Sequence, residues 1–326
     1  MTPSEPPVVP GPPVPPPGPH GGDGPAVAAA LGLDPATVLD LSQSLNPFAP
    51  DVPRLATAHL DALREYPDRG AATRLLATTL GVEPERLLLT NGGSEAISLL
   101  ASELGGTVIS EPEFALHPRG PEPVRWRSDP HNPLGTLAPA GADAEVWDEA
   151  YYPLATGRWT AGRRGVVVGS LTKLWACPGL RLGYVLAEPA LVSRLARRQP
   201  AWPVSTLALA LLPDLLAATD LPIWSAGIAR ARGELVDVLA RHGIATDPSD
   251  APWVLAHDPS LRSRLAPEGI VVRDCTSFGL PDRVRIAVPD GDGLARLAGA
   301  LDGTAPGDRP DAGRPASSRS DLPTSQ

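Results

Sequence analysis

The sequence predicts an α/β protein: a large domain built on a doubly wound, mainly parallel sheet, followed by a smaller C-terminal α/β domain. Short apolar runs alternate with helical stretches between residues 86 and 187. Several of these runs are apolar at consecutive positions, as in strands that are covered on both faces. After Pro189 the pattern changes to three helical stretches, and short apolar runs return only after Gly243. The change indicates the second domain.

The expected strands of the large sheet occupy, in chain order, residues 86–90, 107–110, 123–126, 144–147, 165–169 and 182–187. The segment SEAISLLASEL, residues 94–104, is expected to be a helix between the first two strands. In the second domain, the expected strands are residues 252–257, 269–272 and 283–288. Ligands of such sheets bind at the carboxyl ends of the strands, so we expect the chemistry directly after the apolar runs.

Composition divides the chain into five segments. Residues 1–19 are rich in proline and residues 304–326 lack apolar periodicity, so we expect both to be disordered. A polyproline ligand is an alternative interpretation of the first segment. Residues 20–53 are expected to form an arm that packs with the small domain. Residues 54–215 are expected to form the large domain and residues 216–303 the small one.

Charge and cysteine content exclude several classes of function. The net charge of −9 argues against a surface that binds nucleic acid. Cys177 and Cys275 have neither metal-ligand nor disulfide spacing, so we expect no metal site and a reducing compartment. The most apolar segment, residues 204–221, contains Pro213 and Asp214 and is too short to span a bilayer. The N-terminus does not resemble a signal peptide, and we expect a soluble, cytoplasmic protein with no membrane partner.

Two expected strand ends carry polar motifs that are weak signals when taken alone. Residues 91–94, Asn-Gly-Gly-Ser, start a helix whose free amides at Gly93 and Ser94 would attract a phosphate. The alternative is a plain turn with Ser94 as the N-cap. The second motif places Asp148 at a strand end with Tyr151 close behind. An acid there can bind a metal, act as a base or pair with a protonated ring nitrogen.

The segment VVVGSLTKLWACPGLRLGY, residues 166–184, is the most informative. It contains Lys173, which is the only lysine in the chain. Ser170, Thr172 and Arg181 are suited to clamp a phosphate. Lys173 is suited to form a Schiff base with a carbonyl, because burial near cations lowers the pKa of an amine. A lone lysine is more often a solvated surface charge, but the residues next to this one include no acid.

An anion cradle, an acid that faces a ring nitrogen and a Schiff-base lysine are all needed by one cofactor, pyridoxal 5′-phosphate (PLP). On these motifs the chain, from about His20 to about Gly303, resembles the fold-type I PLP enzymes of the class I/II aminotransferase superfamily. The S-x-T-K…P-G-x-R-x-G-Y pattern is the most specific part of the match. The resemblance implies that Lys173 is the Schiff-base lysine and that Asp148 is the partner of the ring nitrogen. The large domain would then bind the cofactor.

The resemblance also implies the other cofactor contacts. Tyr151 and Asn132 would hydrogen-bond the ring hydroxyl, and Phe114 would stack on the ring face. Tyr66 resembles a tyrosine that reaches the phosphate in a neighbouring subunit, which implies a homodimer with shared active sites. The implied phosphate ligands are Gly93, Ser94, Ser170, Thr172 and Arg181.

Residues 20–50 and 269–288 resemble the corresponding parts of the L-threonine-O-3-phosphate decarboxylases of cobalamin biosynthesis. This resemblance implies decarboxylation of threonine phosphate to aminopropanol phosphate, with His20 and Gly21 at the substrate phosphate. Asn132 and Arg285 would contact the substrate, where the arginine fork suits its α-carboxylate. Three alternatives remain: His20 only ends a proline-rich arm, the chain is an aminotransferase of the histidinol-phosphate type, or it is an idle relative that binds a partner.

Three positions depart from the family pattern. Asn132 and Asp148 are only 16 residues apart, so the helix that usually lies between these strands is expected to be shortened or absent. Ser44 stands where the relatives usually have asparagine, and Leu134 replaces a threonine of the N-P-T-G turn. None of the three removes a cofactor contact, whereas Ser44 alters the expected substrate contacts.

Overall fold

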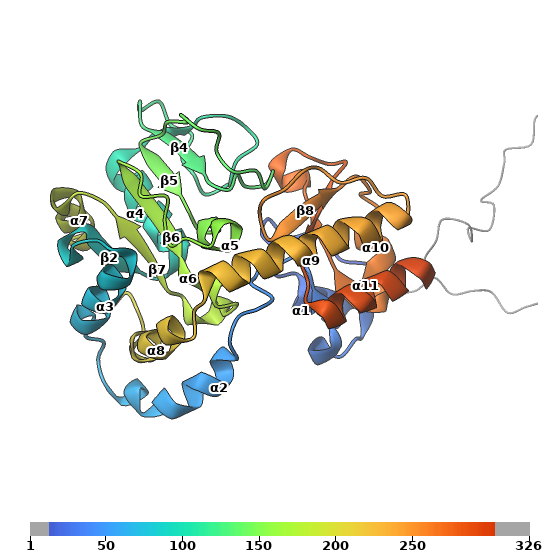
Figure 1. The fold of residues 1–326 in the computed structure, drawn as a ribbon, viewed down its shortest axis with the longest axis horizontal. Helices are drawn as coiled ribbons and strands as arrows, with labels where there is room; N and C mark the ends of the chain where they lie inside the picture. Colours follow the sequence, from blue (N-terminus) through green and yellow to red (C-terminus); the bar gives the residue numbers. More distant parts are fainter. Residues whose placement is uncertain (1–12, 304–326) are drawn as a thin grey trace, which may run out of the picture.

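The computed structural model describes residues 13–303 and shows two lobes joined by a long helix (Figure 1). The larger lobe is built on a six-stranded sheet and the smaller lobe on a three-stranded sheet. The disorder predicted for the two ends falls mainly on residues 1–12 and 304–326, which lie outside the described residues.

The six-stranded sheet has the order β2-β7-β6-β5-β4-β3. Strands β3 to β6 pair in parallel, whereas β7 is antiparallel to both of its neighbours, β6 and β2. Five strands therefore run in one direction, which confirms the predicted α/β class with a mainly parallel sheet. The strands are β2 (Leu87–Thr90), β3 (Thr107–Val108), β4 (Arg125–Ser128), β5 (Val146–Asp148), β6 (Val166–Ser170) and β7 (Gly183–Leu186).

Both faces of this sheet are buried, because neighbouring residues of one strand enter different cores. Trp147 and Val167 pack into one core, while Val146 and Val168 pack into the other. Each buried side chain of this size contributes roughly 1.5–3 kcal/mol to folding. This double burial explains why the strands read as continuous apolar runs rather than as alternating ones.

The helices of the larger lobe are α2 (Val52–Ala56), α3 (Gly70–Leu80), α4 (Gly92–Leu104), α5 (Tyr152–Thr156), α6 (Leu171–Leu174), α7 (Pro189–Ala196) and α8 (Thr206–Ala217).

No helix connects β4 to β5, as the short spacing between Asn132 and Asp148 predicts. The loop of residues 129–145 is held instead by bonds within itself and to the smaller lobe. The Ala138 amide donates to Asp129 (2.8 Å), and the Leu137 amide donates to Asp250 (2.9 Å). The Trp253 indole donates to the Pro133 carbonyl at 2.8 Å. These contacts place the loop, and Asn132 within it, at the junction of the two lobes.

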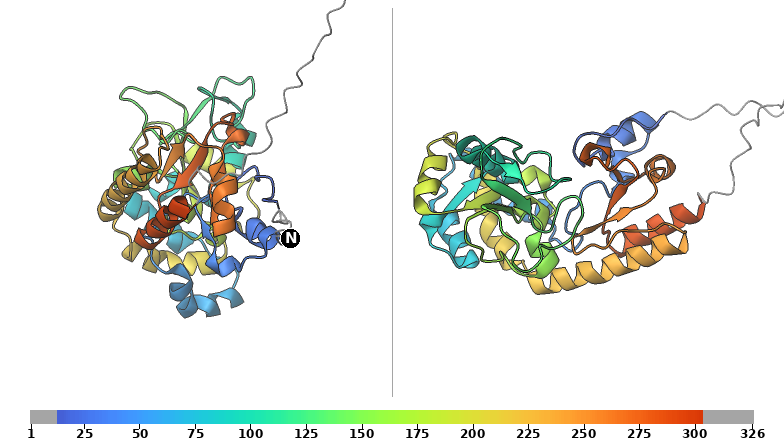
Figure 2. Two further views of the ribbon diagram at one scale, coloured as in Figure 1. Left: turned by 90° about the vertical axis from the view of Figure 1, so that its right-hand side faces the viewer. Right: turned by 90° about the horizontal axis from the view of Figure 1, so that it is seen from above.

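Helix α9 (Leu221–Arg241) extends from the larger lobe, where it contacts α5, to the smaller lobe, where α11 (Gly291–Gly303) lies beside it (Figure 2). The small sheet is antiparallel in the order β10-β11-β8. The remaining elements of this lobe are β8 (Trp253–Ala256), α10 (Leu261–Leu265), β9 (Ile270–Val271), β10 (Arg273–Asp274) and β11 (Val284–Ala287).

The N-terminal segment lies against the smaller lobe. It contains α1 (Gly24–Leu31) and β1 (Leu39–Asp40), and β1 pairs in parallel with β9. Residues 13–19, which the sequence assigns to the extension, also make contacts there. The Pro15 carbonyl accepts a bond from Arg262 (3.3 Å), and the Pro19 carbonyl accepts one from Arg273 (2.9 Å). The five segment boundaries stay a prediction.

Within residues 13–303, no single helix has both the length and the apolar composition needed to cross a bilayer. Helices α8 and α9 meet these criteria only when they are taken together, and they are bent by 81° relative to each other.

Candidate active site

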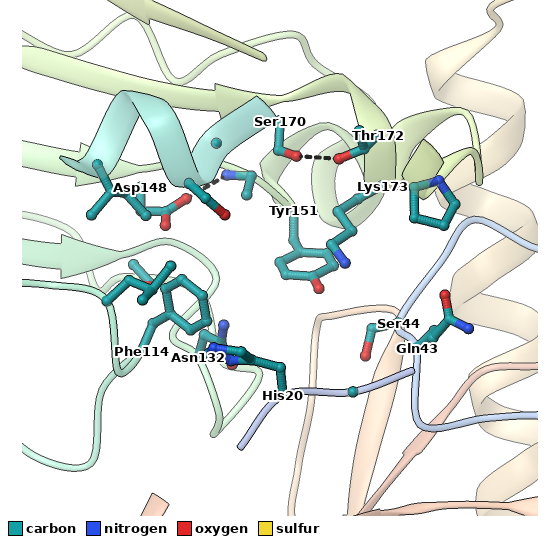
Figure 3. A pocket seen from close by; sticks show the side chains of 18 of the residues that line it. His20, Gln43, Ser44, Phe114, Asn132, Asp148, Tyr151, Ser170, Thr172 and Lys173 are labelled. Atoms are coloured by element: carbon teal, nitrogen blue, oxygen red, sulfur yellow. Dashed lines mark hydrogen bonds between the residues drawn. The ribbon is translucent and has the colours of Figure 1, made fainter. Parts of the chain in front are cut away.

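A cavity of about 300 Å³ lies where β5 and β6 end, between the two lobes and the N-terminal arm (Figure 3). The residues that line it are far apart in the sequence, and they include both Lys173 and Asp148. Every residue predicted for the site lines it except Tyr66: His20, Gly21, Gly93, Ser94, Phe114, Asn132, Asp148, Tyr151, Ser170, Thr172, Lys173, Arg181 and Arg285.

One end of the cavity carries anion-binding groups around the N-terminus of α4. The helix begins at Gly92 with Asn91 as its N-cap, so the alternative of Ser94 as the N-cap is wrong. Gly92 has a φ of 72°, and a Cβ atom there would lie 2.5 Å from the Arg181 guanidinium. Arg181 itself donates to the Asn91 carbonyl at 3.2 Å. The positive φ and the nearby guanidinium both favour glycine at this position, and Arg181 lies against the backbone at the N-terminus of the helix.

Two hydroxyl groups complete this end of the cavity. The Ser170 and Thr172 side chains lie 2.8 Å apart, oxygen to oxygen, on the turn that links β6 to α6 (Figure 3). Helix amides, hydroxyls and a guanidinium are the donors that proteins use for phosphate. The arrangement is suited to a phosphate group.

Asp148 lies at the end of β5 and is 8% exposed. One of its carboxylate oxygens accepts the Ala150 amide (2.9 Å), and the other is 3.1 Å from Nε2 of His117. Nδ1 of His117 has no hydrogen-bond partner among residues 13–303 and lies 3.9 Å from the buried carboxylate of Glu113. Asp148 is thus fixed in position by groups at its back while it lines the cavity.

Lys173 lies in α6, directly after the strand end of β6. The backbone of this turn is held by Asn46 of the N-terminal arm, whose amide donates to the Lys173 carbonyl at 3.2 Å. The Asn46 side chain donates to the Leu174 carbonyl at 2.9 Å. The Lys173 side chain extends into the cavity beside Tyr151 (Figure 3). The backbone that carries this amine is therefore restrained by hydrogen bonds, while the amine itself faces the cavity.

The opposite wall carries two arginines. Arg273 and Arg285 are directly opposite each other on β10 and β11 and are 6% and 4% exposed. Burial, and the charge of Arg285 beside it, lower the pKa of Arg273 to about 10. Arg285 donates to the Asn132 side chain at 2.9 Å. Arg273 donates to the Pro19 carbonyl at 2.9 Å and to the Ser277 hydroxyl at 3.4 Å, and within residues 13–303 neither guanidinium lies within salt-bridge distance of a carboxylate. Paired, buried like charges destabilise a sheet, so this pair indicates an anionic ligand.

The N-terminal arm closes the cavity. A Cβ atom on Gly21 would lie 2.2 Å from the Ser42 carbonyl, so the two backbone segments pack as closely as glycine allows. The His20 ring lies 6.2 Å from the Phe114 ring, centroid to centroid. The Ser44 hydroxyl is buried in the cavity wall and has no hydrogen-bond partner in the part of the chain that the structure describes. The arm therefore places polar groups of residues 20–44 opposite Lys173 (Figure 3).

Tyr66 lies outside the cavity. It is 77% exposed, and its ring is 4.5 Å from that of Trp202 on the surface. Within one chain it makes no contribution to the site.

Comparison with known proteins identifies the family. A sequence profile described as "Aminotransferase class I and II" matches residues 128–301, more than half of the chain. Threonine-phosphate decarboxylase from Salmonella typhimurium is 30% identical over 89% of this chain and 98% of that protein. The chain belongs to the class I and II aminotransferase family.

Two further proteins are similar to most of this chain, one in sequence and one in fold. Histidinol-phosphate aminotransferase 2 from Ralstonia nicotianae is 27% identical over 80% of this chain and 87% of that protein. The crystal structure of histidinol-phosphate aminotransferase from Sinorhizobium meliloti in complex with pyridoxal-5′-phosphate has a TM-score of 0.69 at 19% identity. It covers 80% of this chain and 89% of that one. The family is PLP-dependent, so this protein is a PLP-dependent enzyme rather than an idle relative.

The groups around the cavity fit the cofactor of the class I and II aminotransferases. The hydrogen-bond donors at the N-terminus of α4 match a phosphate group. A Cβ atom at Gly92 would take up space that the Arg181 guanidinium, one of these donors, occupies. The buried carboxylate of Asp148 matches a protonated ring nitrogen, and the amine of Lys173 matches an aldehyde.

Sequence reasoning missed two residues. His117 follows Phe114 by three positions, but only the fold shows that its ring reaches Asp148. Arg273 lies on a short strand, and the pairing of β10 with β11 places it beside Arg285. The available signal was an arginine in each of two neighbouring apolar runs of the small domain, where buried charge is rare.

Proposed function

We propose that this enzyme decarboxylates L-threonine O-3-phosphate to aminopropanol phosphate for cobalamin biosynthesis. The observation that carries the proposal is the pair of buried arginines, Arg273 and Arg285, which face the cavity without a carboxylate partner among residues 13–303. Threonine phosphate has two anionic groups, a carboxylate and a phosphate, that are only a few bonds apart. It would neutralise both cations at once. The similarity to the Salmonella decarboxylase over nearly its whole length supports the same reaction.

In this proposal Lys173 and Asp148, which line one cavity, would both hold the cofactor. PLP, when bound, supplies an electron sink for the pair of electrons that remains on Cα after carbon dioxide leaves. Asp148 keeps a positive charge on the ring nitrogen, and His117 holds the carboxylate in place for that purpose. Tyr151 and Asn132 orient the ring through its hydroxyl group, and Phe114 covers one ring face. The phosphate ligands are those of the α4 cradle: Gly93, Ser94, Ser170, Thr172 and Arg181.

The substrate is oriented from the side of the small lobe. Arg285, which donates a hydrogen bond to Asn132, would bind the α-carboxylate and so orient the bond that is broken. Arg273, with His20 and the amide of Gly21, takes the phosphate of the substrate. Lys173, as the amine in the cavity, returns a proton to Cα after carbon dioxide has left.

Transamination is the second candidate, and the similarity to histidinol-phosphate aminotransferases supports it about as well. The same residues would serve, because the two reactions differ in which bond of Cα is held perpendicular to the ring. Histidinol phosphate carries one anionic group and would leave one arginine unpaired. An amino-acid donor with two carboxylates would pair with both. The arginine pair thus favours a substrate with two anionic groups.

The products separate these candidates. We expect the PLP-loaded enzyme to release carbon dioxide from threonine phosphate without α-ketoglutarate and without forming a keto acid. Carbon dioxide release and the conversion of α-ketoglutarate to glutamate are measured in the same sample, with histidinol phosphate plus α-ketoglutarate as the second arm. Formation of glutamate from α-ketoglutarate, without release of carbon dioxide, would contradict decarboxylation and establish the aminotransferase.

We also propose that the enzyme is a cytoplasmic homodimer with shared active sites. Its two cysteines are free, which suits a reducing compartment. Tyr66 and the segment before it expose further apolar side chains: Leu60 and Leu63 are 52% and 61% exposed, and Trp202, whose ring contacts that of Tyr66, is 56% exposed. Exposed apolar side chains that cluster in this way mark a surface that another chain covers. Tyr66 would reach the cofactor phosphate of the second subunit.

Complementation between two inactive variants tests the shared site. Tyr66→Ala removes the side chain that crosses the interface, and Lys173→Ala removes the catalytic amine. A mixed dimer would contain one site with both residues intact, so we expect co-expression of the two variants to restore activity that neither has alone. The readouts are activity and the molecular mass in solution. A monomeric wild type, or no recovery from dimers proven to be mixed, would contradict the shared site.

A further inference from the structure

The back of β5 carries a charged cluster that the proposed chemistry does not use. Successive side chains of a strand point to opposite faces, so Trp147 and Glu149 project away from the side on which Asp148 lies. Asp129, at the end of the neighbouring strand β4, lies beside them and is 1% exposed. Glu149 is 1% exposed as well, and burial raises the pKa of its carboxyl group.

Arg163, from the loop that precedes β6, joins this cluster. One of its terminal nitrogens donates to Glu149 at 3.1 Å and the other pairs with Asp129. The guanidinium carbon lies 3.8 Å above the Trp147 ring. A single side chain thus contacts both residues that flank Asp148 in the sequence and the acid beside it. Two buried carboxylates without this cation would be costly, because each would be an uncompensated charge.

The same cluster is bonded to the backbone of Asp148. The Asp129 amide donates to the Asp148 carbonyl at 2.8 Å. The other carboxylate oxygen of Asp129 accepts the Ala138 amide and so holds the loop that replaces a helix between β4 and β5. The position and the orientation of the Asp148 side chain therefore depend on Asp129 and Glu149, which Arg163 holds together.

We propose that Arg163 is a positioning residue for the cofactor. From the back of the sheet it would fix Asp148 at the ring nitrogen, next to the loop of residues 129–145 that connects β4 to β5 without a helix. The inference rests on the role proposed for Asp148. The titratable groups around Asp148 are His117, Glu113 and His131 on one side, Asp129, Glu149, Arg163 and Tyr184 on the other, and Lys173 across the cavity.

The test compares Arg163→Gln, Arg163→Lys and Arg125→Gln. Arg125 is a matched control, because it also pairs with two carboxylates, Asp143 and Glu145, but does so on the exposed surface of the same two strands. Three quantities are measured: the dissociation constant of PLP by tryptophan fluorescence, the pH midpoint of the visible absorbance of the bound cofactor, and the melting temperature of the cofactor-free protein.

Arg163→Gln is expected to weaken PLP binding by about tenfold or more. It is also expected to raise the pH midpoint by roughly one unit or more. A ring nitrogen without its acidic partner loses its proton, and less positive charge then opposes protonation of the nitrogen that joins Lys173 to the cofactor. Arg163→Lys, which keeps the charge and loses the fork, should fall between the wild type and Arg163→Gln. Arg125→Gln should match the wild type.

A wild-type dissociation constant and midpoint in Arg163→Gln, whatever its melting temperature, would overturn the inference. If Arg163→Gln does not fold, the triple variant Asp129→Asn, Glu149→Gln, Arg163→Gln takes its place, because it leaves no unpaired charge in the cluster. We expect the triple variant to fold and to have the raised pH midpoint. A wild-type pH midpoint in the triple variant would also overturn the inference. The variant Asp148→Asn distinguishes a failure of the proposed cofactor site from a failure of the role proposed for Arg163. An unchanged midpoint in Asp148→Asn refutes the proposed cofactor site, whereas a shift in Asp148→Asn without one in Arg163→Gln refutes only the role of Arg163.

Discussion

Lys173→Ala is expected to lower the rate of the enzyme by at least about 10³-fold, because the chain has no other lysine to attach the cofactor or to move a proton at Cα. The side chain projects into the cavity from a turn whose backbone is held by Asn46. Truncation there leaves the phosphate cradle and Asp148 in place. The variant should therefore still bind PLP through its phosphate, but without the visible absorbance of the cofactor joined to the amine.

Two measurements check this result. Single-turnover rates report the loss of activity, and equilibrium dialysis reports whether PLP is still bound. Addition of a small primary amine provides the control, since it can replace the missing amine chemically without restoring any structural contact. Recovery of part of the rate by the amine would support the assignment. An active Lys173→Ala variant, or one that has lost all affinity for PLP, would contradict it.

Arg285→Gln is expected to produce the second-largest effect, this time on the substrate. Loss of one partner of a buried, charge-assisted contact costs roughly 2–5 kcal/mol, so KM for threonine phosphate should rise by at least about 30-fold. The absorbance of the bound cofactor should stay unchanged, because Arg285 is assigned to the substrate and contacts the proposed cofactor ligands through a hydrogen bond to Asn132. Stability should be retained, since the substitution also removes the repulsion between Arg285 and Arg273.

Arg273→Gln is the companion experiment, because the two arginines are assigned to different groups of the substrate. Threonine, which lacks the phosphate, should lose little affinity on replacement of Arg273 and much on replacement of Arg285. Kinetics with threonine and threonine phosphate in both variants check this pattern. Loss of the cofactor absorbance in Arg285→Gln would show that the carboxylate contact is wrongly assigned. Equal effects of both variants on both substrates would contradict the division of roles.

Much of the site could be predicted because it lies where strands end. Each apolar run of the large sheet is followed at once by polar residues, and parallel strands bring such ends to one edge. Asp148 at the end of β5 and Lys173 just after β6 line one cavity for this reason, although 25 residues separate them in the sequence. A sheet that is covered on both faces also makes its strands continuous apolar runs, and this pattern is sufficient to predict the fold class.

The missed features depend on pairing between segments that carry no shared local signal. The contact of His117 with Asp148 needs the loop before β4 to fold back under the sheet, and the Arg273–Arg285 pair needs the register of β10 and β11. The alternative of Ser94 as the N-cap of α4 is wrong although serine favours that position: the observed N-cap, Asn91, lies three residues earlier and is followed by Gly92 with a positive φ.

Reductive trapping followed by mass spectrometry tests the central claim most directly. The enzyme is loaded with PLP, reduced with borohydride, digested after arginine and mapped, so that the residue that carried the cofactor keeps it as a stable adduct. Because the chain contains a single lysine, the result is unambiguous. The account predicts one adduct, on Lys173, which is absent from Lys173→Ala. Bound cofactor with no adduct at Lys173, or an adduct only at the N-terminal amine, would contradict it.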